Sequence, residues 1–141
     1  MQTLCDVNVL LALVYARHAH HDQAARWADG RRDHEIVLCR ITQLGLLRLL
    51  SNATVMQQDT CTHESAWRIW DSILGDERFM FVREPDGMER FLRQYTQVDV
   101  PSPKLWQDAY LAAFCRSAAL QMTTFDRGFQ RFPNLQFVLL D

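Results

Sequence analysis

Three aspartates in this 141-residue chain stand in surroundings where a carboxylate could take part in metal chemistry. Asp6 follows the short segment Thr3–Cys5, Asp126 follows the segment 121–124, and Asp108 lies in a third region of the chain. Carboxylates that gather without a matching positive charge repel one another. A hard cation such as Mg²⁺ or Mn²⁺ removes that cost, because it prefers carboxylate and water oxygens. The three aspartates are therefore candidate ligands of a divalent cation.

The position of Asp108 is the most informative of the three. It stands in the second turn of a predicted helix, and its neighbours on the same helix face are Leu105, Leu111 and Ala112. An ionised carboxylate on an otherwise apolar face is costly unless a positive charge compensates it. The pattern favours a carboxylate that has such a partner.

Each aspartate also has a simpler structural explanation. Asp6 could cap the helix that follows it, and Asp126 could form a turn, as aspartates commonly do. Asp108 could face solvent beside Trp106. For any one of these aspartates the simpler explanation is favoured. The placement of all three on one predicted arrangement of alternating strands and helices favours a metal site instead.

Segments typical of strands and helices alternate along the chain. Helices are predicted at 9–15, 21–29, 42–50, 61–74, 87–95 and 103–117, and strands at 3–5, 36–39, 79–82, 121–124 and 135–140. Thr42 is expected to cap the third helix, and Ser102 and Pro103 to open the last one. The alternation predicts an α/β fold with a central, mostly parallel sheet and helices on both faces. In such sheets ligands bind beyond the carboxyl ends of the strands, where Asp6 and Asp126 stand.

Length and composition are typical of one globular domain. A chain of 141 residues suits a single core, so one domain is expected over residues 1–141. No apolar run approaches the roughly 20 residues of a membrane-spanning helix, and no signal-like stretch precedes Asp6, so we expect a cytoplasmic protein. The four cysteines lack the close spacing of zinc or redox motifs and are expected to be reduced packing residues.

The charge balance gives no general sign of nucleic-acid binding. A net charge of −2 lacks the basic excess that is usual in proteins that bind nucleic acids. An acidic metal cluster would itself subtract positive charge, and the basic residues are nearly all arginines, with Lys104 the only lysine. Because arginine binds phosphate in a two-pronged geometry, a near-neutral charge still permits an RNA substrate.

Five segments, taken in order, resemble those of PIN-domain ribonuclease toxins, the VapC-like half of VapBC toxin–antitoxin pairs. They are Asp6-x-Asn8, His21-x-x-Ala24-x-x-Trp27, the stretch 40–52, Trp106-x-Asp108-Ala109-Tyr110 and Thr124-Phe125-Asp126-Arg127-Gly128-Phe129. The likeness spans nearly the whole chain. The Thr-Phe-Asp turn and the Asp-Ala-Tyr helix are specific as a pair, though each is weak alone. The resemblance implies a PIN-like α/β domain.

The resemblance also implies that the protein is a metal-dependent endoribonuclease, which hydrolyses phosphodiester bonds in tRNA or another structured RNA. It further implies that a VapB-like antitoxin inhibits this activity. On this basis Asp6, Asp108 and Asp126 ligate one or two Mg²⁺ or Mn²⁺ ions, which activate water and stabilise charge on the phosphate. Asn8 would orient Asp6, and Thr124 would act similarly near Asp126. A homodimer is expected.

One family feature is missing from the sequence. The family usually carries a glutamate early in the helix after the second strand; our best alignment places Gln43 there, with Gly45 as the alternative. Gln43 could still bind the cation through its amide oxygen or a water, with weaker attraction. A catalytically weak or inactive PIN-like module that binds RNA or a protein partner therefore stays open. Arg48, in the same helix, either extends to solvent or contacts substrate phosphate.

Overall fold

Five short parallel strands form the centre of the computed structural model, which describes residues 1–141. The strands are β1 (Thr3–Cys5), β2 (Ile36–Leu38), β3 (Phe79–Phe81), β4 (Gln121–Thr124) and β5 (Phe137–Leu139). They lie in the order β3-β2-β1-β4-β5, and every neighbouring pair is parallel. The chain builds one side of the sheet from β1 and then crosses to the other, so the strand order reverses between β1 and β4. The predicted α/β fold is confirmed, with a sheet that is wholly parallel.

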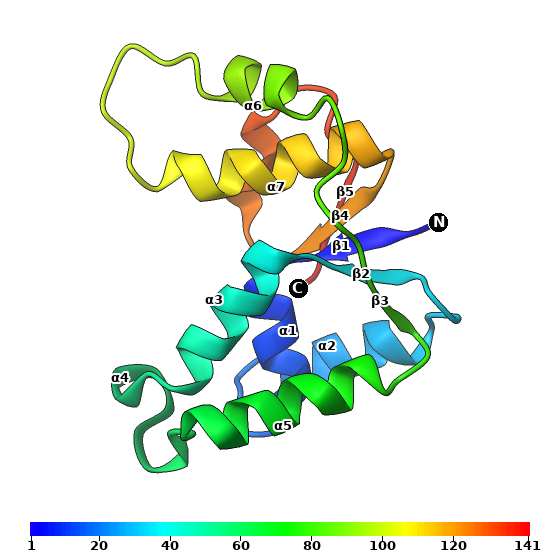
Figure 1. Cartoon of the computed structure of the whole chain (residues 1–141), viewed down its shortest axis with the longest axis vertical. Helices are drawn as coiled ribbons and strands as arrows, with labels where there is room; N and C mark the ends of the chain where they lie inside the picture. Colours follow the sequence, from blue (N-terminus) through cyan, green and yellow to red (C-terminus); the bar gives the residue numbers. More distant parts are fainter.

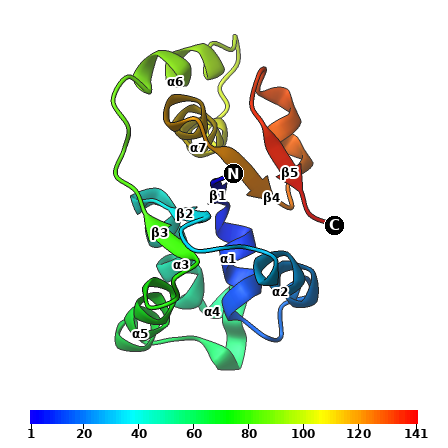
Figure 2. The same cartoon turned by 90° about the vertical axis from the view of Figure 1, so that its right-hand side faces the viewer.

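Helices cover both faces of this sheet (Figures 1 and 2). Helices α6 and α7 lie over one face, and α1, α2, α3 and α5 lie over the other. The helices are α1 (Val7–Val14), α2 (His21–Asp29), α3 (Arg40–Leu50), α4 (Ala53–Met56), α5 (His63–Leu74), α6 (Glu89–Tyr95) and α7 (Leu105–Ala118), with the 3-10 helices η1 (Gln57–Asp59) and η2 (Arg127–Arg131). None of them combines the length and apolar content that crossing a bilayer demands.

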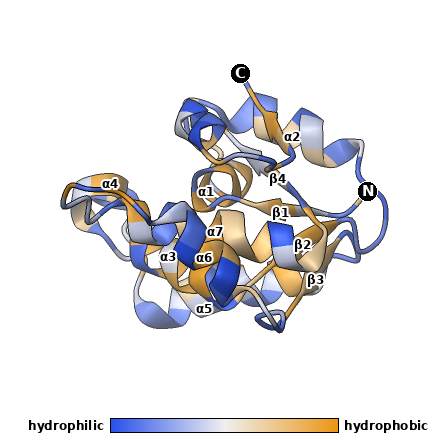
Figure 3. Cartoon of the chain, turned by 90° about the horizontal axis from the view of Figure 1, so that it is seen from above, coloured by the Kyte–Doolittle hydropathy of each residue, from blue (hydrophilic) through white to orange (hydrophobic).

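Side chains of the strands pack alternately into two hydrophobic cores. Leu4 of β1 joins the core beneath α7, whereas the next residue, Cys5, joins the core formed with α1, α3 and α5. This follows from the strand geometry, because successive side chains point to opposite faces. Figure 3 shows hydrophobic colour along the central strands. All four cysteines are free and three of them, Cys5, Cys39 and Cys115, are buried, which confirms their expected packing role.

Five of the six predicted helix starts differ from the structure, and at two of them the expected capping residue differs as well. Thr42 does not cap α3; Cys39 is the N-cap, and the Thr42 hydroxyl accepts a hydrogen bond from the Cys39 backbone N–H at 3.0 Å. Helix α7 begins at Leu105 and not at Pro103, because the Ser102 carbonyl accepts the Leu105 N–H and closes a turn just before the helix. Each of the five starts is displaced by two residues, which leaves the direction of each helix unchanged.

The segment between α3 and α5 contains two helices, α4 and η1, that the sequence did not predict. Asn52 caps α4 by accepting the backbone N–H of Thr54 at 2.9 Å. The Tyr15 hydroxyl, which follows α1, donates to Asp59 at 2.6 Å and holds η1 against the rest of the fold. Contacts between distant segments, rather than local periodicity, give this polar stretch its structure.

The core beneath α7 should be more sensitive to truncation than the protein surface. Phe114 is fully buried there, so Phe114→Ala should lower the free energy of unfolding by about 3–5 kcal/mol. Leu44, which is 55% exposed on α3, provides the control, and Leu44→Ala should change it by less than about 0.5 kcal/mol. Urea denaturation of the two variants measures the difference. Equal losses of unfolding free energy in the two variants would mean that Phe114 is not buried in the core beneath α7 as described.

Candidate active site

The structure brings Asp6, Asp108 and Asp126 to one edge of the sheet. Asp6 follows β1 and Asp126 lies just beyond β4, and these two strands are hydrogen-bonded neighbours. Parallel strands end at the same edge, and the strand order reverses between these two, which is where open α/β sheets bind ligands. Asp108 reaches the same place from α7, which packs against both strands.

Asp6 is held in one orientation by two hydrogen bonds. Its Oδ1 accepts the backbone N–H of Val7 at 2.7 Å, so Asp6 does cap α1, and its Oδ2 accepts the Thr124 hydroxyl at 2.7 Å. Thr124 belongs to β4, and its hydroxyl oxygen also accepts the backbone N–H of Asp126 at 2.9 Å. One hydroxyl therefore links the aspartates that follow two neighbouring strands.

Asp126 has the turn-forming role that its sequence position allows. Its Oδ1 accepts the backbone N–H of Gly128 at 2.7 Å and caps η2. The residue is exposed, and its carboxylate borders the same cavity as Asp6. The local role and the placement at the candidate site are therefore compatible.

Asp108 is half-buried and already has a cationic partner. Its Oδ2 accepts a hydrogen bond from Nη2 of Arg131 at 3.0 Å. Burial raises the pKa of the Asp108 carboxyl above its usual value; the Arg131 charge opposes this shift, and the Asp126 charge adds to it. The neighbouring Trp106, by contrast, is 62% exposed.

The electrostatic environment of Asp6 is also unfavourable to a negative charge. Burial raises the pKa of the Asp6 carboxyl, and the hydrogen bonds from Thr124 and Val7 act in the opposite direction. The charges of Asp108 and Asp126 raise the pKa of Asp6 further. The carboxylates therefore interact through their charges across the cavity.

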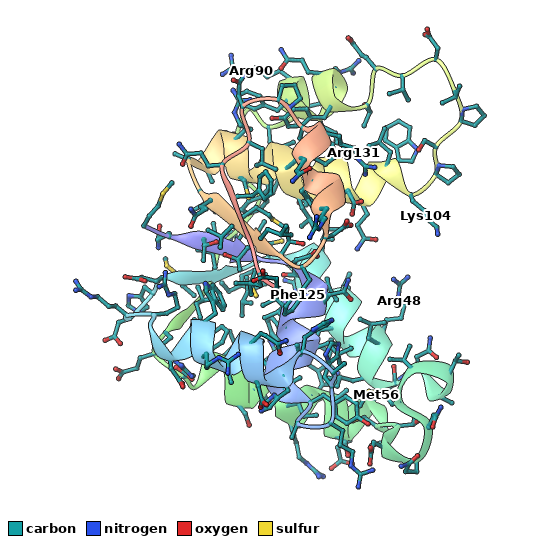
Figure 4. The ribbon with its side chains drawn as sticks, turned by 180° about the vertical axis from the view of Figure 1, so that it is seen from behind. Arg48, Met56, Arg90, Lys104, Phe125 and Arg131 are labelled. Carbon is teal, nitrogen blue, oxygen red and sulfur yellow. The ribbon has the colours of Figure 1, made fainter.

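The three aspartates border one open cavity of about 470 Å³. Two basic residues, Arg48 from α3 and Lys104 just before α7, line it as well, and neither makes an ion pair. Figure 4 shows both of them on the same side of the molecule as Arg131. The sequence suggested Arg48, but it did not suggest Lys104 or Arg131. The sequence did offer one signal for them, because Lys104 lies close to Asp108 along the chain and Arg131 lies close to Asp126.

The donor chemistry fits a hard divalent cation, although the side chains are not in a coordinating arrangement. No group of three or more His, Cys, Asp or Glu side chains is placed so that it could hold a metal ion. Asp108 is engaged by Arg131, and the other two carboxylates accept hydrogen bonds from the backbone. Three carboxylates around one cavity, with the pKa raised in two of them, carry the kind of negative charge that Mg²⁺ or Mn²⁺ compensates. Metal binding therefore requires these side chains to reorient.

The structure separates the two candidates for the position of the missing glutamate. Gln43 is buried and does not line the cavity; its Oε1 accepts a hydrogen bond from Arg40. Gly45 does line the cavity, and a Cβ atom added there would lie 2.8 Å from Cγ2 of Val7. Of the two candidates, Gly45 therefore borders the cavity and Gln43 does not. The assignment of Gln43 to the position of the family's glutamate stays a prediction, and neither residue supplies a carboxylate.

The two residues expected to support the aspartates differ in what they do. Asn8 is exposed and lines the cavity, but it makes no hydrogen bond to Asp6. Thr124 is fully buried and binds Asp6 directly, in addition to contacting the backbone of Asp126. The hydroxyl of Thr124, and not the Asn8 amide, orients Asp6 in this structure.

Comparisons with known proteins find similarity over most of the chain. The profile of the PIN domain family matches residues 3–135. The chain is 37% identical over 142 residues to Ribonuclease VapC41 of Mycobacterium tuberculosis, covering 97% of each protein. VapBC2 of Rickettsia felis, bound to a fragment of its promoter DNA, has a similar fold, with a TM-score of 0.68, 13% identity and full coverage of both chains. Mycobacterium tuberculosis VapC20, described as a sarcin-ricin loop cleaving toxin, has a TM-score of 0.65 and 18% identity over 92% of this chain and 93% of its own.

Removing the buried charge of Asp6 should stabilise the protein in the absence of metal. Because folding raises the pKa of Asp6, the native state is favoured by protonation below the unfolded pKa, and this stability is lost as the pH rises through the folded pKa. In a chelator at neutral pH, Asp6→Asn should therefore melt a few degrees above the wild type, and the gap should close below about pH 4. Calorimetry across pH measures this, with the exposed Asp71→Asn as a control. If the melting temperature of the wild type at neutral pH were equal to or higher than that of Asp6→Asn, the unfavourable charge assigned to Asp6 would be contradicted.

The contact between Gly45 and Val7 should appear as an energetic coupling. Gly45→Ala should lower the free energy of unfolding by about 1–3 kcal/mol despite alanine's better helix propensity, because the new methyl group overlaps Val7. In a chain that carries Val7→Ala, which removes the opposing Cγ atoms, the same substitution should cost less. Urea titrations of the two single variants and the double variant complete the cycle. Strictly additive losses would show that the two positions do not meet.

Proposed function

The chain belongs to the PIN-domain family, with VapC ribonucleases among its relatives, and on this basis we propose that it is an Mg²⁺- or Mn²⁺-dependent endoribonuclease that acts as the toxin of a toxin–antitoxin pair. It hydrolyses phosphodiester bonds in RNA, with tRNA or another structured RNA as the substrate class. Residues 1–141 form one PIN-like nuclease domain.

The observation that carries this proposal is the gathering of opposite charges around one cavity. Asp6, Asp108 and Asp126 border it together with Arg48 and Lys104. A nuclease that uses a cation needs acidic ligands for the ion and basic groups for the phosphate backbone in the same place. The cavity combines both at the edge of the sheet where ligands bind.

The three aspartates would hold the cation. When bound, Mg²⁺ or Mn²⁺ supplies charge stabilisation to the reacting phosphate and lowers the pKa of water. In the metal-free protein the Thr124 hydroxyl donates to Oδ2 of Asp6 and the Val7 N–H donates to the other oxygen, so the carboxylate would exchange at least one of these bonds for the cation. Gly45 contributes no ligand, so the cation depends on three carboxylates.

Arg48 and Lys104 would bind the phosphates on either side of the scissile bond. Arg48 projects from α3 and Lys104 precedes α7, so the two charges come from helices on opposite faces of the sheet. Neither is neutralised by an ion pair within the chain. Contacts of this kind position a nucleic acid and carry no sequence information. RNA specificity would come from surfaces beyond the cavity.

A VapB-like antitoxin and a second copy of the chain are the proposed protein partners. The Rickettsia felis structure of similar fold is a VapBC2 complex, which supports a partner of this kind. Exposed apolar side chains on α3, α5 and α7, namely Leu44, Trp67 and Trp106, are available for such contacts. An RNA-cleaving toxin of this kind would act in the cytoplasm.

A PIN-like module that binds RNA or a partner without efficient cleavage is the second candidate. The missing glutamate favours it, because neither Gln43 nor Gly45 supplies a carboxylate and no three acidic groups stand in a coordinating arrangement. Fewer carboxylates lower the attraction for a divalent cation. Only cleavage itself separates this candidate from the first.

Metal-dependent cleavage of a mixed RNA pool tests the two candidates. The wild type should degrade RNA with Mg²⁺ or Mn²⁺ and not with a chelator. Asp6→Asn, Asp108→Asn and Asp126→Asn should each reduce the rate by more than about 100-fold, since loss of mere supporting partners of metal ligands already costs roughly 10- to 100-fold. Sequencing of the 5′ ends identifies the RNA that is cut.

The exposed Asp71→Asn on α5 is the matched control and should leave the cleavage rate unchanged. Wild-type protein that binds RNA but cuts none of it would favour the second candidate. Full activity in the three aspartate variants would refute the assignment of the site.

A further inference from the structure

Arg131 is the only cation paired with any of the three aspartates. Its Nη2 donates to Oδ2 of Asp108 at 3.0 Å, while Asp6 and Asp126 take part in no ion pair. The side chains of Arg131 and Asp108 are 47% and 31% exposed, respectively. Asp108 lines the cavity of the three aspartates, whereas Arg131 lines a neighbouring one, so the pair joins the edges of the two cavities and is partly open to solvent.

The helix η2 positions two of the groups involved. Asp126 caps its start and Arg131 is its last residue. Phe129 and Phe132, on either side of Arg131 in sequence, are 1% and 4% exposed and fix this segment in the core. The Arg131 guanidinium lies 5.0 Å from the Phe132 ring. The backbone at Arg131 is therefore anchored, while its half-exposed side chain has solvent to move into.

The ion pair and a bound cation compete for the same carboxylate. A carboxylate that binds a divalent cation cannot keep its full attraction for a guanidinium, and two positive groups at one oxygen repel each other. Cation binding at Asp108 therefore weakens the hold on Arg131. A guanidinium that is released beside a phosphate-binding cavity is well suited to a phosphate oxygen, because its N–H groups match the geometry of that anion.

We propose that Arg131 is an internal counter-ion of Asp108 that the divalent cation displaces, and that the released guanidinium then binds a phosphate oxygen of the RNA. The second step rests on the proposed function. Arg131 thus links metal loading to substrate binding. It lowers the affinity of the free protein for the metal and raises the affinity of the loaded protein for phosphate.

Titration of Mn²⁺ alone into the full chain tests the first step. At low ionic strength Arg131→Gln should bind Mn²⁺ roughly two- to fivefold more tightly than the wild type, the range that a half-exposed ion pair allows. Arg131→Lys, which keeps the charge, should remain closer to the wild type. Arg127→Gln on the same helix is the matched control, because Arg127 is exposed and makes no ion pair. Unchanged or weaker binding by Arg131→Gln, or equal tightening by Arg127→Gln, would overturn the counter-ion role.

Binding of adenosine 5′-monophosphate in saturating Mn²⁺ tests the second step, with a probe that has no phosphodiester to cleave. Arg131→Gln should weaken this binding several-fold, Arg131→Lys should weaken it less, and Arg127→Gln should leave it near the wild-type value. Tighter metal binding with unchanged nucleotide binding would overturn the phosphate role. Since neither measurement requires RNA cleavage, both results can hold for a protein that cuts no RNA, and in that case only the proposed function fails. Circular dichroism confirms that each variant is folded.

Discussion

The candidate site depends on the parallel pairing of β1 with β4. Their register places Leu4 beside Met122 and Cys5 beside Thr123, so the next residue of β4, Thr124, meets Asp6. A slip of one residue would turn every side chain of β4 to the other face of the sheet and remove the Thr124 hydroxyl from Asp6. Packing of the two hydrophobic cores therefore sets the position of a polar contact between residues from opposite ends of the chain.

Charge at this edge of the sheet is balanced only in part. Burial and mutual repulsion raise the pKa of Asp6 and Asp108, and one guanidinium, that of Arg131, offsets the charge of Asp108. The remaining basic groups, Arg48 and Lys104, stand at the cavity without ion pairs. Such a partly compensated arrangement destabilises the metal-free protein slightly. The negative charge that remains could be neutralised by a divalent cation. The same imbalance that weakens the fold would favour the binding of a divalent cation in the proposed function.

Gly45 shows how packing and chemistry compete for one position. A side chain at this point would press on Val7, which starts the helix that Asp6 caps. The close approach of α3 to α1 at this position leaves no space for a larger side chain without movement of Val7. The result is a site with three acidic groups in a family that usually has one more. In the proposed mechanism, the metal affinity of such a site would depend more heavily on the Arg131–Asp108 ion pair.

Periodicity and turn chemistry in the sequence were sufficient to predict the α/β architecture and most element bounds, because these signals are local. They were also sufficient to name Asp6, Asp108 and Asp126 as the candidate site, because each of these aspartates lies next to a strand or helix end. That Gly45 borders the cavity and Gln43 does not needed the tertiary structure, since it depends on which turn of a helix faces the cavity. The Arg131–Asp108 pair needed it as well, because it joins a residue of η2 to a residue of α7 that lies 23 positions away in the sequence. Long-range contacts of that kind leave no periodic trace in a single sequence.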